Sequence, residues 1–465
     1  AMATDALADT PELIERAVGE ALLNRSISLS SYEALGPPDL CCCVKVYERA
    51  WLPGDVASLP ATGYYHWVIG ADVSCAAAVS TYFDGLLRKQ QSSSWYAGGV
   101  YKIRSATFCM YNAFDHTDVR CEATFPGSLK AFTINEEGVR TEVSEEAWQQ
   151  AYMCSVLRSL AGPTPQLDCL ALLPPLPTVN SEKLFCELTN RLFWKGRFLG
   201  RNPIYGNHEL AHNWMTSLIV EHYTNHCRFE QLAQLIEPLA AAEPSLVGHL
   251  SLALRRQGLN DRATQMLQAA VEKVGNLPAL LTAQAEIALL DNRPNIAITA
   301  MREAIRQEPE AIKPWLVMAQ AYSRLKAWDT VLMLLNEAPM RDAAPAISVT
   351  VGLPNPTGKT HAPRRPDPAR VDVDPTLDEE EGLFEMEKPP DLPASSLTEP
   401  WLSAFDILVE AMNAVGWDKL LEIRAKVFLM KEDMERKRQE SAQNAGEAEQ
   451  RGLGHIVEEG EGGGA

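Results

Sequence analysis

The sequence predicts an α+β protein in which a β-rich N-terminal domain is followed by an α-helical solenoid of tetratricopeptide type. Two observations support this fold class: alternating apolar segments between residues 40 and 140, and a later 34-residue spacing of helical segments. The chain divides into an N-terminal helix (1–35), a β-rich domain (36–143), a helical connector (144–207), helical repeats (208–343), a proline-rich acidic linker (344–400), a helical segment (401–438) and a disordered tail (439–465).

The composition is that of globular domains and excludes several classes of function. The chain has 465 residues, of which 46% are hydrophobic. A net charge of −19 and a pI of about 5.0 argue against a nucleic-acid binder, since that function needs clusters of Lys and Arg. They also argue against direct adsorption to an anionic membrane. No signal peptide or membrane span is expected, and the ten irregularly spaced cysteines predict buried thiols of a cytosolic protein.

Residues 11–35 are predicted to form a helix. Pro11 suits a first turn, and the apolar residues that follow share one stripe at helical spacing. This stripe consists of Leu13, Ile14, Ala17, Val18, Ala21 and Leu22. The string LGPPDL at 35–40 then ends the helix.

The next hundred residues are predicted to be rich in strands. Strand-like segments are CCCVKVYERAWL, YYHWVIGADVS and GGVYKIRSATFCMYNAF, with a helix expected from about Ala76 to Lys89. VRCEATF and LKAFTIN predict a hairpin around Pro126-Gly127, where the glycine supplies the turn conformation.

The hydrophobic period changes from 2 to 3.6 at Ser144. This serine is expected to cap a helix, and Glu145 and Glu146 suit the positive end of its dipole. Ser181 is expected to cap a second helix. The apolar face of that helix would consist of Leu184, Phe185, Leu188, Leu192 and Phe193.

Three segments beginning at residues 247, 281 and 315 superpose at a 34-residue spacing. In that register the coinciding residues are Ala263, Ala297 and Val331, then Leu267, Met301 and Leu335, then Ala270, Ala304 and Ala338. The spacing indicates tetratricopeptide repeats, in which small residues lie where two helices cross closely. Such an array has an extended concave surface that suits the binding of peptides and proteins.

One string resembles an active site. GNHELAHNW contains the H-E-x-x-H pattern of zinc proteases at His208, Glu209 and His212, which on a helix would place both imidazoles on one face. The extended zinc motif fails, because Met215 stands in place of its glycine and Leu218 in place of its third histidine. We therefore expect a helix of the first repeat, with no metal, cofactor or catalytic residue. A zinc-dependent metallohydrolase is the alternative.

Four strings resemble the fungal ChAPs family, the cargo adaptors of the exomer coat. They are LGPPDL, LKAFTINEEGV, KPWLVMAQAYSRLKAWDTVLMLLNEAPM and FDILVEAMNAVGWDKLLEIRAKVFLMKEDM. The matches are spread in order over residues 11 to 435. Members of the family continue beyond the position of Met434 with further helical repeats, so contacts made by that part lie outside the resemblance.

The resemblance implies a non-catalytic protein that lies peripherally on the cytoplasmic side of the trans-Golgi network and exports cargo to the plasma membrane. The partners it implies are a scaffold protein, an Arf-type GTPase in its GTP form, transmembrane cargo such as chitin synthase, and paralogous adaptor subunits. Nucleic acid is not among them, and the membrane is contacted only peripherally. Six residues are candidates for holding the scaffold: Leu13, Ile14, Val18, Leu35, Pro37 and Pro38. These residues could instead simply pack on the β-rich region.

Overall fold

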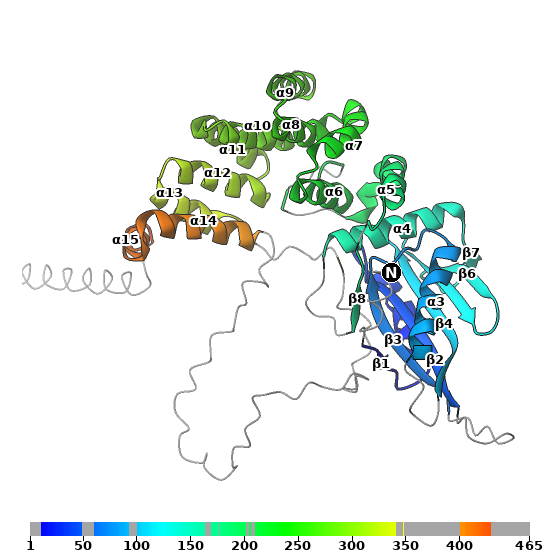
Figure 1. Cartoon of the computed structure of the whole chain (residues 1–465). Coiled ribbons are helices and arrows are strands. Elements are labelled where there is room, and N and C mark those ends of the chain that lie inside the picture. The colour runs from blue at the N-terminus through cyan, green and yellow to red at the C-terminus, as the bar shows by residue number, and fades with distance from the viewer. Residues whose placement is uncertain are drawn as a thin grey trace, which may run out of the picture.

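The computed structural model describes residues 11–48, 60–92, 100–162, 169–174, 176–200, 204–205, 210–340, 347 and 400–428. Figure 1 shows a twisted β-sheet at one end of the molecule and a curved array of helix pairs at the other. The predicted fold class is confirmed. Within the described residues, no helix combines the length and the apolar character that crossing a membrane requires.

The sheet is antiparallel apart from its last strand. Its strands are β1 (Leu13–Ile14), β2 (Asp39–Glu48), β3 (Thr62–Ile69), β4 (Val100–Asn112), β5 (Thr117–Thr124), β6 (Leu129–Ile134), β7 (Arg140–Glu142) and β8 (Leu170–Leu172). They follow the order β1-β3-β2-β4-β5-β6-β7, and β8 pairs with β3 in parallel. Strands β1 and β8 therefore share the outer side of β3.

The predicted hairpin and the helix inside the β-rich region are both confirmed. Strands β5 and β6 pair from Ala123 opposite Leu129 onward, so Pro126-Gly127 lies in the connection. A Cβ at Gly127 would lie 2.2 Å from the Thr124 hydroxyl oxygen, which is why the connection needs a glycine there. Helix α3 (Ala76–Ser92) packs against β4 and β6.

The helix expected over residues 11–35 is wrong in its first part. Its apolar residues begin as strand β1, and the helix α2 spans only Glu20–Ile27. The Glu15 backbone N–H donates to the Gly63 carbonyl at 2.9 Å, and its carboxylate accepts from the N–H groups of Gly19 and Ala21 at 2.7 and 3.0 Å. These bonds end the strand and start the helix, so pairing with β3 overrides the helical spacing.

The described residues of the connector form two α-helices. They are α4 (Glu145–Leu160) and α5 (Val179–Leu192), and the 3-10 segment η2 (Phe193–Leu199) follows. The Ser144 hydroxyl accepts from the Ala147 N–H at 3.1 Å, which confirms this residue as a cap. The expected cap at Ser181 is wrong by three residues. Thr178 caps α5, and Ser181 is its partner three residues on in a capping box.

The helical part consists of antiparallel pairs. Their members are α6 (Trp214–Asn225) with α7 (Phe229–Ala242), α8 (Val247–Arg256) with α9 (Asn260–Val274), α10 (Pro278–Leu290) with α11 (Pro294–Gln307), α12 (Ile312–Arg324) with α13 (Trp328–Glu337), and α14 (Trp401–Val415) with α15 (Trp417–Val427). Successive first helices stack, with α8 on α10, α10 on α12 and α12 on α14. They form the concave side of the array (Figure 1).

The 34-residue period is confirmed by packing. Helices α9, α11 and α13 begin 34 residues apart. Ala263, Ala297 and Val331 are all fully buried, each on the second helix of its pair. The other two coinciding rows are buried as well, apart from Leu335, which is half-buried.

The turns inside the pairs repeat with the same period. Gly258, Asn292 and Lys326 occupy equivalent positions, with φ of 85°, 55° and 59°. This left-handed backbone lets the second helix start two residues later and run back along the first. Glycine and asparagine tolerate the conformation more readily than lysine does.

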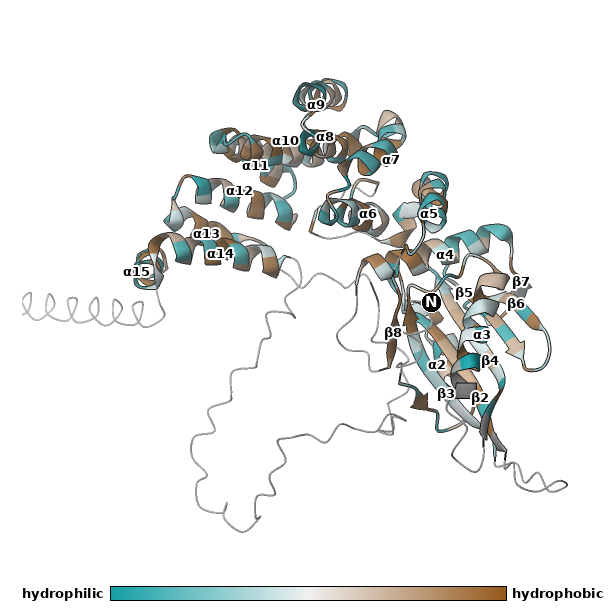
Figure 2. Ribbon diagram, viewed as in Figure 1, coloured by the Kyte–Doolittle hydropathy of each residue, from teal (hydrophilic) through white to brown (hydrophobic). Residues whose placement is uncertain are grey.

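One continuous core joins the sheet to the first helix pairs. It runs from the buried face of the sheet through α4 and α6 to α10, with Met153 and Met215 fully buried along the way. Figure 2 shows the apolar residues gathered between the sheet, the connector and the helices. Since no solvent layer separates the two parts, the groove described below has a fixed position relative to the sheet.

Candidate functional site: a groove on the concave face

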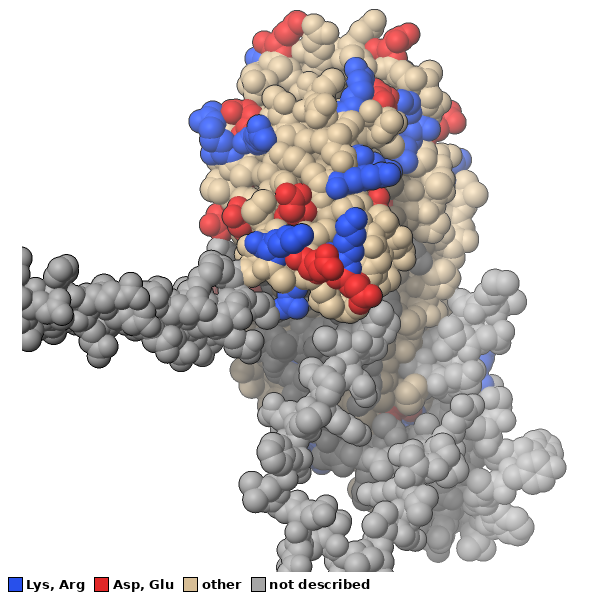
Figure 3. Space-filling model, turned by 90° about the vertical axis from the view of Figure 1, so that its left-hand side faces the viewer, with Lys and Arg blue, Asp and Glu red and all other residues tan. Residues whose placement is uncertain are grey.

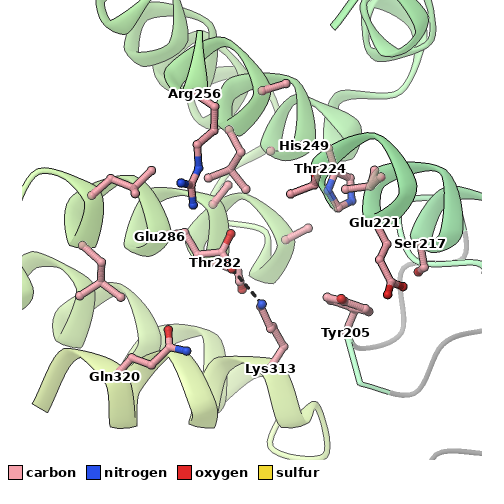
Figure 4. Close-up of a pocket in the computed structure, with 18 of the residues that line it drawn as sticks. Tyr205, Ser217, Glu221, Thr224, His249, Arg256, Thr282, Glu286, Lys313 and Gln320 are labelled. Carbon is pink, nitrogen blue, oxygen red and sulfur yellow. Dashed lines mark ion pairs between the residues drawn. The ribbon is translucent and has the colours of Figure 1, made fainter. Parts of the chain in front are cut away.

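The concave side of the helical array contains a cavity of about 570 Å³. Most of its lining comes from the first helices of the pairs, α6, α8, α10, α12 and α14. Equivalent residues of successive pairs recur along it, since the repeat places the same position of each first helix on the same wall. Figure 4 shows side chains from several of these helices converging on one space.

Two rows of equivalent residues line this groove. One row contains Leu252, Glu286 and Gln320, and the other contains Arg256, Leu290 and Arg324. Members of each row are 34 residues apart. The mixture of cationic, anionic and apolar side chains suits a polypeptide more than a uniformly apolar ligand.

An ion pair crosses the middle of the groove. The Lys313 ammonium lies 3.1 Å from the Glu286 carboxylate, and both side chains are partly exposed (Figure 4). Partial exposure limits the contribution of such a pair to stability to about 1 kcal/mol or less. The pair joins α10 to α12 and neutralises charge at the groove floor.

The short segment Ile204-Tyr205, which precedes α6, stabilises the groove through contacts with α12 and with His212. The Ile204 carbonyl accepts a hydrogen bond from the backbone N–H of Lys313 at 2.8 Å. The Tyr205 ring stacks on His212, with centroids 5.5 Å apart and planes at 14°. His212 in turn meets the edge of His249 at 5.5 Å. These contacts connect the start of α6 and helix α8 to the start of α12, and so help to set the curvature of the array.

His249 forms part of the groove wall. Its Nε2 lies 3.1 Å from the Ala211 carbonyl. Burial lowers the pKa of the imidazole below its usual 6.5, although this hydrogen bond and the Glu286 carboxylate act in the other direction. The ring is therefore neutral near pH 7.

The described part of the H-E-x-x-H string does not lie on a helix. Leu210–His212 form a turn and a bend, and helix α6 begins only at Trp214. The Asn213 side-chain oxygen accepts from the Thr216 N–H at 2.8 Å and caps that helix. The expectation of a helix is thus wrong for this part of the string. His208 and Glu209 lie outside the described residues.

The metal alternative gains no support from the geometry. Across the described residues, no group of three or more His, Cys, Asp or Glu side chains is arranged to hold a metal ion. His212 is buried between the rings of Tyr205 and His249, and its role there is to pack against them.

The six candidate partner-binding residues have different surroundings. Leu13 is buried against the sheet and Ile14 is half-buried. Leu35, Pro37 and Pro38 are buried. Val18 is 52% exposed. Among the six, Val18 is therefore the residue whose side chain is mostly accessible, and a partner role for the group stays a prediction.

The packing of LGPPDL has a clear structural cause. Arg158 of α4 donates to the Leu35 carbonyl at 2.7 Å and to the Asp39 carboxylate at 2.8 Å. It also donates to the Tyr111 carbonyl at 3.1 Å. Because both Arg158 and Asp39 are fully buried, the string is fixed between α4 and the sheet.

Sequence reasoning missed two groups of accessible residues. On α2, Leu23 and Ile27 are 61% and 70% exposed and lie one turn apart, in the same segment as Val18. We call these three residues the α2 patch. In the groove, the missed residues are Arg256 and Arg324. Their signal was present in the 34-residue register, which places both at one repeat position.

The net negative charge is not concentrated on the end of the helical array. Figure 3 shows Lys and Arg side chains interspersed with Asp and Glu on that face. Elsewhere in the helical array, Arg306 pairs with Glu303 and Arg293 with Asp291. A mixed surface of this kind has no strong long-range field for or against an anionic partner.

Comparisons with known proteins agree with this architecture. Among curated proteins, the chain is 28% identical over 445 residues to an uncharacterized protein of Schizosaccharomyces pombe, covering 91% of this chain and 66% of the relative. It is 20% identical to protein BCH1 of Saccharomyces cerevisiae, covering 95% and 71%, and 20% identical to bud site selection protein 7 of the same yeast, covering 80% and 55%. The chain thus spans between about half and three quarters of these relatives.

Solved structures have the same fold. A chain of the Chs5-Bch1 exomer cargo adaptor complex superposes with a TM-score of 0.68 at 20% identity, covering 90% of this chain and 69% of that one. A chain of the Chs5-Chs6 exomer cargo adaptor complex bound to a portion of Chs3 superposes with a TM-score of 0.58 at 18% identity, covering 73% and 54%. The family model described as ChAPs (Chs5p-Arf1p-binding proteins) matches residues 60–435. Because that match covers most of the chain, the protein belongs to the ChAPs family.

Proposed function

We propose that this chain is a non-catalytic cargo-adaptor subunit of an exomer-type coat. In this role it binds a scaffold protein, an Arf-type GTPase in its GTP form and the cytoplasmic segments of transmembrane cargo such as chitin synthase. It acts beside paralogous adaptors at the trans-Golgi network and directs cargo to the plasma membrane.

The observation that carries the proposal is the groove on the concave face. A cavity of about 570 Å³ lined by equivalent side chains of stacked helices offers many shallow contacts along one line. An extended peptide can use such contacts in succession, whereas a small substrate would need a few convergent catalytic groups. Family membership and the fold shared with exomer adaptor chains support the same role.

The α2 patch is the surface we assign to the scaffold. Val18, Leu23 and Ile27 are all more than half exposed. The buried candidates Leu13, Leu35, Pro37 and Pro38 would support this surface by fixing the segments that lead into and out of α2. Recruitment to the membrane would come through the partners, because the net charge of −19 disfavours adsorption to anionic lipid.

A pull-down tests the proposal. The purified chain is immobilised and offered an Arf-type GTPase loaded with GDP or a non-hydrolysable GTP analogue, an exomer scaffold, and the cytoplasmic segment of a chitin synthase. We expect recovery of the scaffold, the cargo segment and only the GTP-loaded GTPase.

Two variants localise the scaffold contact. Leu23→Lys combined with Ile27→Lys should reduce scaffold recovery at least fivefold, because two desolvated side chains are replaced by charges. Val274→Lys serves as the control, because Val274 is 37% exposed and its helix α9 lies far from α2 (Figure 2). Failure of the folded wild-type chain to recover scaffold or cargo contradicts the adaptor role, and equal recovery by all variants contradicts the scaffold assignment.

A further inference from the structure

We propose that the groove selects an extended acidic peptide, with two carboxylate side chains about five or six residues apart and an apolar side chain between them. This inference rests on the proposed function, since it specifies the chemistry of the segment that the groove binds. It follows from the row Arg256, Leu290 and Arg324.

The two arginines are available to a ligand. Both line the cavity and both are exposed. In the part of the chain that the structure describes, neither guanidinium takes part in a hydrogen bond or an ion pair. Figure 4 shows Arg256 extending from its helix into the space between the helices. A guanidinium with five N–H donors directed into a groove favours a carboxylate partner.

The repeat sets the spacing of the ligand groups. Arg256 and Arg324 lie at the same position of α8 and α12, with α10 between them. Packed helices lie about 8–10 Å apart, so the two positions are separated by roughly 16–20 Å. An extended chain rises about 3.3 Å per residue, so this distance corresponds to about five or six residues.

Leu290 determines which kind of peptide side chain is favoured between the two acidic residues of the ligand. It occupies the equivalent position of α10, lines the cavity and is 40% exposed. An apolar side chain midway along the peptide would cover it, and removing this surface from water is favourable. The row therefore specifies the order acidic, apolar, acidic.

The remaining charges limit the positive potential of the groove. Lys313 is already paired with Glu286. Asp406 and Glu410 line the cavity on α14. These carboxylates would repel a uniformly acidic segment at that end of the groove. A peptide with only its two central carboxylates avoids this repulsion, so the groove favours one register.

Fluorescence anisotropy with synthetic peptides provides the test. The reference peptide is fluorescein-labelled Gly-Ser-Asp-Ser-Leu-Ser-Ser-Ser-Asp-Ser-Gly, whose two Asp residues are six positions apart and share one face of the extended chain with the Leu between them. The comparison peptides have both Asp residues replaced by Asn or by Lys. We expect the wild-type chain to bind the Asp peptide roughly tenfold more tightly than the Asn peptide, a difference of about 1.4 kcal/mol that two exposed ion pairs can supply. The preference should weaken as salt is raised.

Charge reversal distinguishes recognition from a structural role. Each arginine is in or next to the last turn of its helix, where a cation also stabilises the helix dipole. Arg256→Glu combined with Arg324→Glu should invert the preference from the Asp peptide to the Lys peptide, which mere destabilisation would not do. Lys273→Glu, the same charge change on α9, should leave the preference unchanged. Melting temperatures confirm that each variant is folded.

Three results would overturn the inference: no binding of the Asp peptide by the folded wild-type chain, equal affinity for the Asp and Asn peptides, or a preference unchanged by the double reversal. The proposed function is tested separately by recovery of the scaffold and the cargo segment. If those partners are recovered while the peptides show no charge preference, the peptide chemistry is wrong and the adaptor role stands. If the partners are not recovered by the wild-type chain, the adaptor role is wrong whatever the peptides do.

Discussion

Arg25 donates from Nε to the carboxylate of Asp118 at 2.9 Å, and both side chains are fully buried. This contact joins α2 to strand β5 across 93 residues of sequence. Arg25 also donates to the Pro38 carbonyl at 3.0 Å, and Arg120 donates to the other carboxylate oxygen of Asp118 at 2.8 Å. The N-terminal segment is thus fixed to the sheet by a buried, charged network, which in turn supports the α2 patch.

Replacing Arg25 should strongly destabilise the protein. We expect Arg25→Met to lower the free energy of unfolding by about 3–5 kcal/mol, because it leaves part of a buried carboxylate unpaired. Urea denaturation followed by circular dichroism measures the change. The control is Arg140→Met, whose partner Glu122 lies 3.9 Å away at the surface, and which should cost less than about 1 kcal/mol. Equal effects of the two substitutions would show that the network is not what fixes α2.

Ala297 is a fully buried residue of α11, which packs tightly against α10. Ala297→Leu should lower the free energy of unfolding by about 1–3 kcal/mol, because the added methylene groups force the two helices apart. Ala269→Leu on the exposed side of α9 adds the same volume without burying it, and we expect a change within about 0.5 kcal/mol. A thermal melt of both variants is sufficient. Tolerance of leucine at position 297 would contradict this tight packing.

The equivalent turn positions Gly258, Asn292 and Lys326 predict two effects of opposite sign on stability. Gly258→Ala should destabilise the protein by about 1 kcal/mol, because φ is 85° and an added Cβ meets no atom within 4 Å, which leaves backbone strain as the cause. Lys326→Gly relieves the same strain at φ 59° and should stabilise it by up to about 1 kcal/mol. Differential scanning calorimetry measures both. Shifts of the same sign in the two variants would contradict a shared left-handed turn.

The partly buried His249 predicts a dependence of stability on pH. Its folded-state pKa is lowered from 6.5, so the unfolded chain takes up a proton first as the pH falls. The contribution of His249 to stability is therefore complete above pH 6.5 and declines below it, until the folded-state pKa is reached. The groups facing the ring are the Ala211 carbonyl, His212, Glu286 and Lys313.

Melting temperatures between pH 7.5 and 5.5 test this dependence. His249→Gln should melt lower than the wild-type chain at pH 7.5, with a difference that narrows toward pH 5.5. Burial and the neighbouring His226 also lower the pKa of His222, so His222→Gln is the comparison that separates the two histidines. A difference between wild type and His249→Gln that is constant across this range would show that the ring does not titrate as expected.

Much of the helical array could be predicted from the sequence. The 34-residue period identified α9, α11 and α13 and the small residues buried on them, because helix pairing repeats the same local contacts in each unit. Ser144 was predicted as a cap, and Pro126-Gly127 as a hairpin connection. Each of these depends on neighbours within a few residues, or on one repeat unit.

The predictions from sequence that were wrong concern segments whose conformation depends on contacts with distant parts of the chain. Leu13 and Ile14 fit a helical stripe equally well, but β3 offers them backbone partners and Glu15 fixes the break. The H-E-x-x-H string has the spacing of a helix, yet Asn213 caps α6 after it and Tyr205 stacks on His212. Arg158 also binds the backbone of LGPPDL from 123 residues away, and a partner role for this string stays a prediction. Strand β3 and Arg158 both lie far along the chain from the segments that they hold.

By itself, then, the sequence determined the fold class, the repeat period and the resemblance to an adaptor family, because hydrophobic periodicity and turn residues act over short distances along the chain. Tertiary structure alone decided which side chains meet in the groove. Arg256, Leu290 and Arg324 are 34 residues apart in the chain and become neighbours only because α8, α10 and α12 stack side by side. That stacking depends on buried area summed over the whole array, which no single segment of sequence contains.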